Sequence, residues 1–208
     1  MISAQDALDR LRDGNRRFVG NESSTSPLLT PAQRLALINS QEPFAIVLGC
    51  SDSRVPAELV FDQGFGDLFV IRVAGNIVAP SQVGSVEFAA ARFGTRLVVV
   101  MGHSQCGAVT AAVEEVLGRT SNESRNLRSI VDRVRPSVET VVSGRPDRNV
   151  DALVSEAVRA NVRASVEHLR HGSPVLEELI RAGSLMVVGA EYSLETGVVD
   201  FFEETGND

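Results

Sequence analysis

The sequence predicts an α/β fold: a mostly parallel β-sheet of about five strands, the last an antiparallel edge strand, flanked by helices. Two observations predict this fold. Four continuous apolar runs, at residues 44–48, 68–71, 97–101 and 185–188, have the length of strands buried on both faces. Stretches with helical spacing of apolar residues separate these runs, which is typical of parallel strands joined by crossover helices.

The N-terminal 40 residues are expected to form a helical arm, and residues 41–208 the α/β core. Apolar residues recur at helical spacing up to Phe18, and Ser3 is a suitable N-cap, so a first amphipathic helix is predicted there. Residues 20–30 are rich in Ser, Thr, Asn and Pro and are expected to form a surface loop. Pro31 is well placed to begin a short helix that ends near residue 38.

The rest of the chain alternates between helices and strands. The apolar pattern predicts helices over residues 81–93, 105–118, 123–142, 150–170 and 174–182. Residues 197–202 predict a short fifth strand that pairs antiparallel at the sheet edge. Residues 119–149 are the most polar stretch, but the fourth strand follows them and needs the same sheet. The whole chain, 1–208, is therefore expected to form one domain.

Composition excludes several classes of function. The net charge of −7 argues against broad binding of nucleic acids or anionic membranes. All 20 basic residues are arginine, which excludes lysine Schiff-base chemistry and phosphate-binding loops that end in Gly-Lys. No apolar run approaches the ~18 residues of a membrane helix. The N-terminus does not resemble a signal peptide, so we expect a cytoplasmic protein whose two cysteines stay reduced.

Potential metal ligands follow two of the predicted strands. Cys50 comes after the first strand, and His103 and Cys106 come after the third. Ligands in open α/β sheets bind at the carboxyl ends of the strands, where these side chains converge if the two strands are neighbours. A cysteine alone is usually a small buried hydrophobe, and a histidine alone a structural residue. The convergence of all three favours a zinc site with a fourth position free for water.

Asp52 and Arg54 lie two residues apart after the first strand, so their side chains can share one side of the chain. Arginine next to a carboxylate keeps it ionised and orients it. On an exposed surface such a pair contributes almost nothing. Beside a metal, Asp52 has two options: it can bind zinc as a fourth ligand in a closed site, or it can pair with Arg54 and accept a hydrogen bond from zinc-bound water.

Several motifs in order resemble the β-class carbonic anhydrases. They are Cys-Ser-Asp-Ser-Arg-Val-Pro at 50–56, Gly-Asp-Leu-Phe-Val-Ile-Arg at 66–72 with Ala-Gly-Asn at 74–76, and Gly-His-Ser-Gln-Cys-Gly at 102–107. The resemblance implies reversible hydration of carbon dioxide to bicarbonate and a proton by zinc-bound hydroxide. It implies one Zn²⁺ per chain on Cys50, His103 and Cys106, with Asp52 and Arg54 as the catalytic pair.

The resemblance also implies an assembly. Its minimum unit is a homodimer, which can pair into a dimer of dimers, with each active site at the interface between copies. The N-terminal helices are expected to embrace the partner copy, a role that suits the first helix because its apolar face has no other evident contact in the sequence.

Two groups of the family differ in a regulatory bicarbonate site. One group has a Trp three residues before the first Cys, where this chain has Val47, so that site is not expected to form even though Arg72 matches its arginine. Gln41 matches a substrate-binding Gln of the other, plant-like group, which implies an open site with Asp52 paired to Arg54. The residues expected at the substrate are Gln41, Phe69, Phe88 and Gly107, and Phe65 could contribute across the interface.

Three other functions are compatible with parts of the sequence. A related zinc hydrolase could act on carbon disulfide or carbonyl sulfide, and tunnel shape would decide between them. A non-catalytic zinc-binding interaction module is a second alternative, but such a site does not need the Asp52–Arg54 pair. A nucleotide-binding α/β domain is disfavoured because Gly64-x-Gly66 precedes a predicted strand instead of following one.

Overall fold

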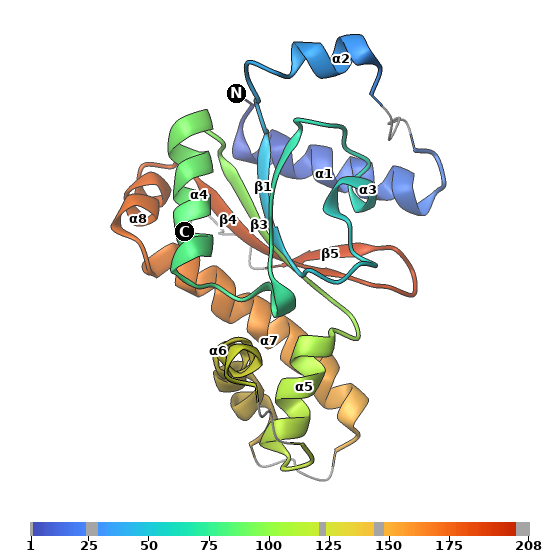
Figure 1. Ribbon diagram of the computed structural model, residues 1–208, viewed down its shortest axis with the longest axis vertical. Helices are drawn as coiled ribbons and strands as arrows, with labels where there is room; N and C mark the ends of the chain where they lie inside the picture. The colour runs from blue at the N-terminus through green and yellow to red at the C-terminus, as the bar shows by residue number, and fades with distance from the viewer. Residues whose placement is uncertain (1, 24–28, 121–123, 144–147, 203–208) are drawn as a thin grey trace.

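The computed structural model describes residues 2–23, 29–120, 124–143 and 148–202. Its five strands form one sheet in the order β2-β1-β3-β4-β5, and Figure 1 shows helices on either side of it. The strands are β1 (Ala45–Gly49), β2 (Leu68–Arg72), β3 (Leu97–His103), β4 (Met186–Tyr192) and β5 (Val199–Phe202). The first four run parallel, and β5 pairs antiparallel with β4, so the predicted α/β fold is confirmed.

The two central strands are buried along their whole length. All five residues of β1 and all seven of β3 are shielded from solvent. Each face of a central parallel strand contacts helices, which is why these segments read as continuous apolar runs instead of alternating ones. The parallel register aligns Gly49 of β1 with Met101 of β3, so both strands end at the same edge of the sheet.

The helices agree with the predicted pattern except at their ends. They are α1 (Ala4–Val19), α2 (Pro31–Ala36), α3 (Ala57–Val60), α4 (Pro80–Phe93), α5 (Gly107–Val116), α6 (Arg125–Val142), α7 (Val150–His171) and α8 (Pro174–Arg181), with a 3₁₀ turn η1 (Ala74–Asn76). Short α3 and η1 were not predicted, because neither is long enough to show a helical period. Residue 123, the predicted start of α6, and part of the predicted loop, 24–28, lie outside the described residues.

The predicted helix over 105–118 begins later than expected, at Gly107. Gln105 has a φ of 55°, a left-handed conformation that an α-helix does not contain. The turn between β3 and α5 therefore includes Gln105, and Cys106 is the residue that caps α5. This turn directs both His103 and Cys106 toward the edge where β1 ends.

Helices cover both faces of the sheet. α1 and α3 pack on one face with β1 and β3, and α4, α7 and α8 pack on the other. A third apolar cluster joins α5, α6 and the first half of α7 beyond the carboxyl edge of the sheet, at the lower end of the view in Figure 1. Within the described ranges, no helix is long and apolar enough to cross a membrane.

The N-terminal segment divides into two unlike helices. In α1, Ala7, Leu8 and Leu11 are fully buried against the chain's own sheet. We expected α1 to embrace a partner copy because its apolar face had no evident contact in the sequence. That reason is wrong, because the face packs on the chain's own sheet. In contrast, α2 has no buried residue, and Leu35 is 64% exposed. Figure 1 shows α2 at one end of the molecule, away from α5 and α6.

Candidate metal centre

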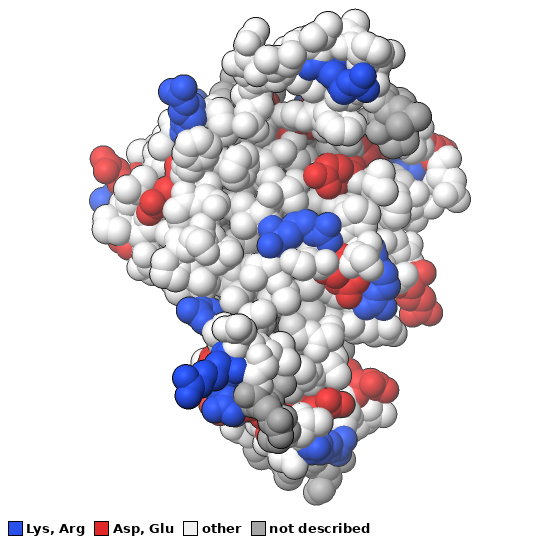
Figure 2. Space-filling view, viewed as in Figure 1, with Lys and Arg blue, Asp and Glu red and all other residues white. Residues whose placement is uncertain are grey.

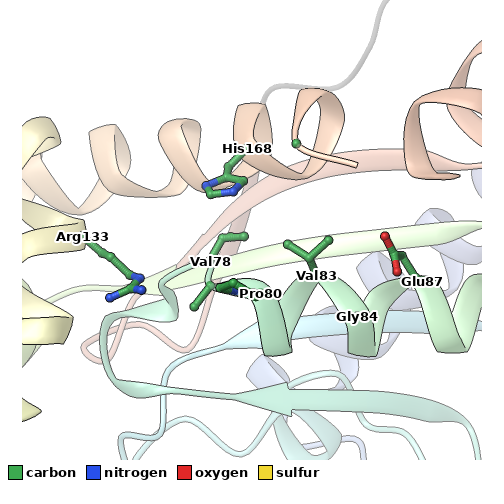
Figure 3. A pocket seen from close by; sticks show the side chains of 9 residues that line it. Val78, Pro80, Val83, Gly84, Glu87, Arg133 and His168 are labelled. Carbon is green, nitrogen blue, oxygen red and sulfur yellow. The ribbon is translucent and has the colours of Figure 1, made fainter. Parts of the chain in front are cut away.

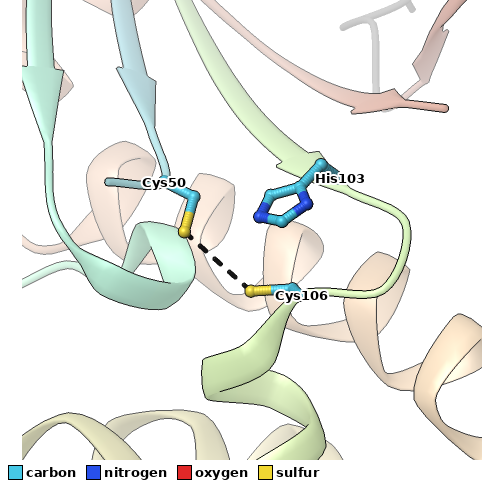
Figure 4. A group of neighbouring side chains, drawn as sticks. All are labelled: Cys50, His103 and Cys106. Carbon is cyan, nitrogen blue, oxygen red and sulfur yellow. Dashed lines mark hydrogen bonds between the residues drawn. The ribbon is translucent and has the colours of Figure 1, made fainter. Parts of the chain in front are cut away.

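Three side chains meet where β1 and β3 end. Cys50 directly follows β1, His103 is the last residue of β3, and Cys106 caps α5. One ligand atom from each lies within 4.8 Å of the others, and the two sulfur atoms are 4.0 Å apart. Figure 4 shows the imidazole of His103 directed toward the two sulfurs. The two strands are neighbours in the sheet, and the convergence expected in that case is what the structure contains.

The imidazole of His103 has one nitrogen bonded and one free. Nδ1 lies 2.9 Å from the carbonyl oxygen of Ser104, an acceptor, which selects the tautomer with hydrogen on Nδ1. Nε2 is buried and has no hydrogen-bond partner among the described residues. A buried, unpaired nitrogen costs about 1–3 kcal/mol unless something binds it. A metal ion between Nε2 and the two sulfurs would use this lone pair, so the residues fit such an ion.

Sequence reasoning missed Ser104, which positions His103. The backbone N–H of Ser104 donates to the carbonyl oxygen of Tyr192, and its hydroxyl oxygen accepts from the N–H of Leu194. These bonds tie the turn after β3 to the end of β4. The only signal in the sequence is the position of Ser104 between two potential ligands, within the motif at residues 102–107.

The two thiols influence each other strongly. Hydrogen bonding from Cys106, with smaller contributions from the N–H groups of Asp52 and Gly75, lowers the pKa of Cys50 to about 4 against the opposing effect of burial. The same hydrogen bond to Cys50 raises the pKa of Cys106, and burial and the charge of the Cys50 thiolate raise it further. The N–H groups of Ala108 and Val109, in the first turn of α5, act in the opposite direction on Cys106. A cation between the two sulfur atoms would offset their repulsion and favour the ionised form of both thiols.

Asp52 lies beside this cluster and is held by Arg54. The guanidinium donates from Nε to Oδ1 at 2.9 Å and from Nη2 to Oδ2 at 2.8 Å, and the backbone N–H of Arg54 donates to Oδ1 at 3.0 Å. These bonds keep the pKa of Asp52 well below its usual range. Oδ2 is 3.9 Å from Nε2 of His103. An ionised acceptor therefore lies next to the position that a metal would occupy.

The residues predicted at the substrate do not lie together within one copy of the chain: Gly107 is next to the cluster, and the others are remote from it. Gly107 adjoins Cys106 as the first residue of α5. Gln41 is exposed before β1, and Phe69 is in register with Ile46, four residues before Cys50. Four residues of a strand span about 13 Å, so Phe69 lies well removed from the cluster in its own chain. Its ring forms a group with those of Phe88 and Phe93, at centroid distances of 6.3 and 6.1 Å.

Surface hollows elsewhere involve other residues. A groove of about 350 Å³ lies between α4 and the end of α7, and Figure 3 shows Arg133 and His168 directed toward Val78 within it. A hollow of about 270 Å³ beside α3 is lined partly by Leu59 and Phe65, which are more than half exposed. On the face seen in Figure 2, acidic and basic side chains are interspersed.

The geometry defines a class of protein: an α/β protein with three side chains that could hold a metal ion and a fixed carboxylate beside them. The sequence profile of the carbonic anhydrase family matches residues 45–199. Carbonic anhydrase 2 of Mycobacterium tuberculosis is 38% identical over 201 residues, which is 97% of this chain and 94% of that protein. Carbonic anhydrase of Mycolicibacterium smegmatis is 37% identical over 205 residues, with the same coverage of 97% and 94%.

Solved structures agree with the sequence comparisons. The β-carbonic anhydrase CcaA superposes with a TM-score of 0.76 at 26% identity, covering 94% of this chain and 95% of that chain. A β-carbonic anhydrase of Sordaria macrospora, from a pair described as tetrameric, shares the fold at a TM-score of 0.74 and 22% identity, over 95% of this chain and 98% of that one. The chain belongs to the carbonic anhydrase family. The predicted enzyme class and its reaction, the reversible hydration of carbon dioxide to bicarbonate, are confirmed.

Proposed function

We propose that this carbonic anhydrase holds one Zn²⁺ per chain on Cys50, His103 and Cys106. One observation carries the proposal: the Nε2 atom of His103 is buried, unpartnered among the described residues, and directed at two thiols. Two soft sulfur donors with one imidazole are a donor set typical of zinc. Bound zinc supplies Lewis-acid activation of water for attack on carbon dioxide.

We propose that Asp52 and Arg54 form the catalytic pair. An ionised carboxylate accepts hydrogen bonds and cannot donate one, so Asp52 accepts a hydrogen bond from the attacking water or hydroxide and thereby turns a lone pair of that oxygen toward carbon dioxide. Arg54 holds the carboxylate in place through two parallel bonds. The N–H of Gly107 belongs to the first turn of α5, where backbone N–H groups lack helical partners, and it is suited to bind an oxygen of bicarbonate.

The same bonds support the open-site, plant-like form. Three of the four hydrogen bonds from Arg54 are made to the Asp52 carboxylate that a closed site would need as a fourth ligand, and the fourth goes to the carbonyl oxygen of Gln105 at 3.5 Å. Val47 is fully buried in β1, where the other group of the family has Trp. We therefore propose that Asp52 stays paired with Arg54 and that the fourth metal position belongs to water and substrate.

We further propose that the working unit is a homodimer with the site at its interface. Gln41, Phe69 and Phe88 are far from the metal ligands of their own chain, as expected of residues that act in another copy. Phe88 is 54% exposed and Phe65 is 59% exposed, which is unusual for large aromatic side chains without a covering partner.

Both cysteines are free thiols, which supports a reducing, cytoplasmic location.

Metal analysis combined with stopped-flow carbon dioxide hydration tests the proposal. The wild-type protein is expected to contain about one zinc ion per chain, as a site of this class requires. His103→Ala should lose both zinc and activity, whereas His168→Ala, at an exposed position on α7, should keep both. Zinc retained in His103→Ala would contradict the ligand assignment. Turnover of carbon disulfide or carbonyl sulfide in place of carbon dioxide would favour the related hydrolases.

A further inference from the structure

Arg72 bonds the turn that carries both a metal ligand and the catalytic carboxylate. It is the last residue of β2, in register with Gly49 at the end of β1. Its Nε donates to the carbonyl oxygen of Cys50 at 3.0 Å, and its Nη2 donates to the carbonyl oxygen of Asp52 at 2.6 Å. One guanidinium thus spans the turn on either side of Ser51.

The neighbours of Arg72 hold the same turn. The N–H of Val73 donates to the carbonyl oxygen of Gly49 at 3.1 Å, and the N–H of Gly75 donates to the sulfur of Cys50 at 3.3 Å. Residues 72–75 therefore contact residues 49–52 at four points, two of which are supplied by Arg72. The segment after β1 has left the sheet here and has no strand partner for its carbonyl groups.

The chemistry of the side chain explains why an arginine suits this place. A guanidinium presents several donors in a rigid fork and stays charged at every working pH, so it can bind two carbonyl oxygens at once. Hydrogen bonds that involve a charged group are stronger than those between neutral groups. A lysine ammonium group at this position could donate to one carbonyl oxygen, but it does not have two donors fixed at the spacing of the two carbonyl oxygens.

We propose that Arg72 is a positioning residue, which fixes the turn so that the sulfur of Cys50 and the carboxylate of Asp52 keep their places relative to His103. This inference rests on the proposed zinc centre. The sequence had matched Arg72 to an arginine of a regulatory bicarbonate site, but here the guanidinium is engaged with two backbone carbonyls.

Zinc affinity and cobalt absorption test this inference without relying on activity. Arg72→Met removes both hydrogen bonds while keeping most of the aliphatic length, and Arg72→Lys restores one donor group. Arg170→Met is the matched control, because Arg170 also donates to a strand carbonyl, that of Val187 at 2.7 Å, in the interior of β4. Each metal-free variant is titrated with zinc against a competing chelator, and its Co²⁺ complex is examined by visible absorption.

Arg72→Met is expected to weaken zinc binding by about 10–100-fold and to change the Co²⁺ spectrum, as loss of a residue that orients a ligand does. Arg72→Lys should fall between Arg72→Met and wild type. Arg170→Met should lose thermal stability and keep wild-type zinc affinity and the wild-type spectrum. If Arg72→Met does not fold, Arg72→Lys decides the question.

Wild-type zinc affinity and an unchanged spectrum in Arg72→Met, or in Arg72→Lys if only that variant folds, would overturn the inference and leave the zinc centre intact. Equal losses in Arg72→Met and Arg170→Met would also overturn it, since general destabilisation would then explain both. A wild-type protein that binds no zinc would instead overturn the proposed function.

Discussion

At the scale of the residue, Asp52 provides the sharpest test of the catalytic pair. Asp52→Asn keeps the size of the side chain but introduces a donor and removes the negative charge. Zinc content should stay at the wild-type level, whereas turnover in the stopped-flow assay should fall by at least about 10²-fold, the usual cost of losing one preorganised hydrogen bond in an active site.

Asp67→Asn is the matched control for Asp52→Asn. Asp67 is also a carboxylate paired with an arginine, since Arg10 donates to it at 2.8 Å, but it lies at the opposite end of the strands, before β2. This control should keep wild-type turnover. If Asp52→Asn were as active as Asp67→Asn, the role assigned to Asp52 would be wrong.

Tyr192 offers a direct measurement of how burial affects ionisation. It is 6% exposed, and burial raises the pKa of its phenol above the usual value. Because Tyr192 is the only tyrosine and the chain has no tryptophan, tyrosinate absorbance in an alkaline titration reports this group alone. The midpoint is expected above about 10, the value of an unperturbed tyrosine.

Burial of Tyr192 makes the stability of the protein depend on pH in the alkaline range. The folded pKa is raised above the unfolded one, so the stabilisation is complete below the unfolded pKa and is lost as pH rises through the folded pKa. The free energy of unfolding should therefore fall at alkaline pH, and this component should be absent from Tyr192→Phe. A titration midpoint at or below the ordinary value would contradict the burial of the phenol.

At the scale of the element, two helical glycines distinguish close packing from intrinsic helix propensity. A Cβ at Gly14 of α1 would lie only 1.8 Å from the carbonyl oxygen of Phe61, whereas a Cβ at Gly84 of α4 would have nothing within 4 Å. Gly84→Ala should stabilise the protein by about 0.5–1 kcal/mol, because alanine favours the helix. Gly14→Ala should destabilise it by about 1–3 kcal/mol, because α1 must move away from α3.

Chemical denaturation of the two glycine variants measures both free energies of unfolding. Stabilisation by both substitutions would show that α1 does not pack against the end of α3 as described. The pair also shows what periodicity misses: the apolar stripe predicted α1, but nothing in the sequence indicated that Gly14 permits the contact with the carbonyl of Phe61.

At the scale of the whole molecule, the exposed apolar surface around α2 predicts association. Ile38 is 70% exposed at the end of α2, and Leu37 lies against Gly66, next to exposed Phe65. Ile38→Asp would place a charge in this surface and should shift sedimentation toward the monomer. Val175→Asp, at a 46% exposed position on α8, should not.

Activity measurements on the same variant test whether the active site needs this association. If Gln41, Phe69 and Phe88 serve the site of another copy, Ile38→Asp should lose turnover while keeping its zinc, and activity should recover at high protein concentration. A fully active monomer would refute the proposal that the site needs a second copy. The division of the chain into an arm of 40 residues and a core stays a prediction.

What the sequence by itself determined is the alternation of elements and the choice of candidate metal ligands. Buried parallel strands must be continuously apolar and end at one edge of the sheet, so Cys50, His103 and Cys106 could be chosen as candidates from the sequence. That β1 and β3 are neighbours, which brings these side chains together, is seen only in the structure. The Asp52–Arg54 pair was also predictable, because its two members are neighbours in the chain.

Only the tertiary structure decided which groups hold these residues in place. The bonds from Arg72 to the turn after β1 and from Ser104 to the end of β4 join segments distant in sequence. Likewise, α1 proved to cover its own sheet, although its amphipathic pattern would be the same on a partner. The period of the apolar residues indicates that one face of a helix is buried, and local spacing indicates which polar side chains are neighbours in the chain. Neither indicates which surface covers that helix face, or which residue distant in sequence supplies the partner of a hydrogen bond.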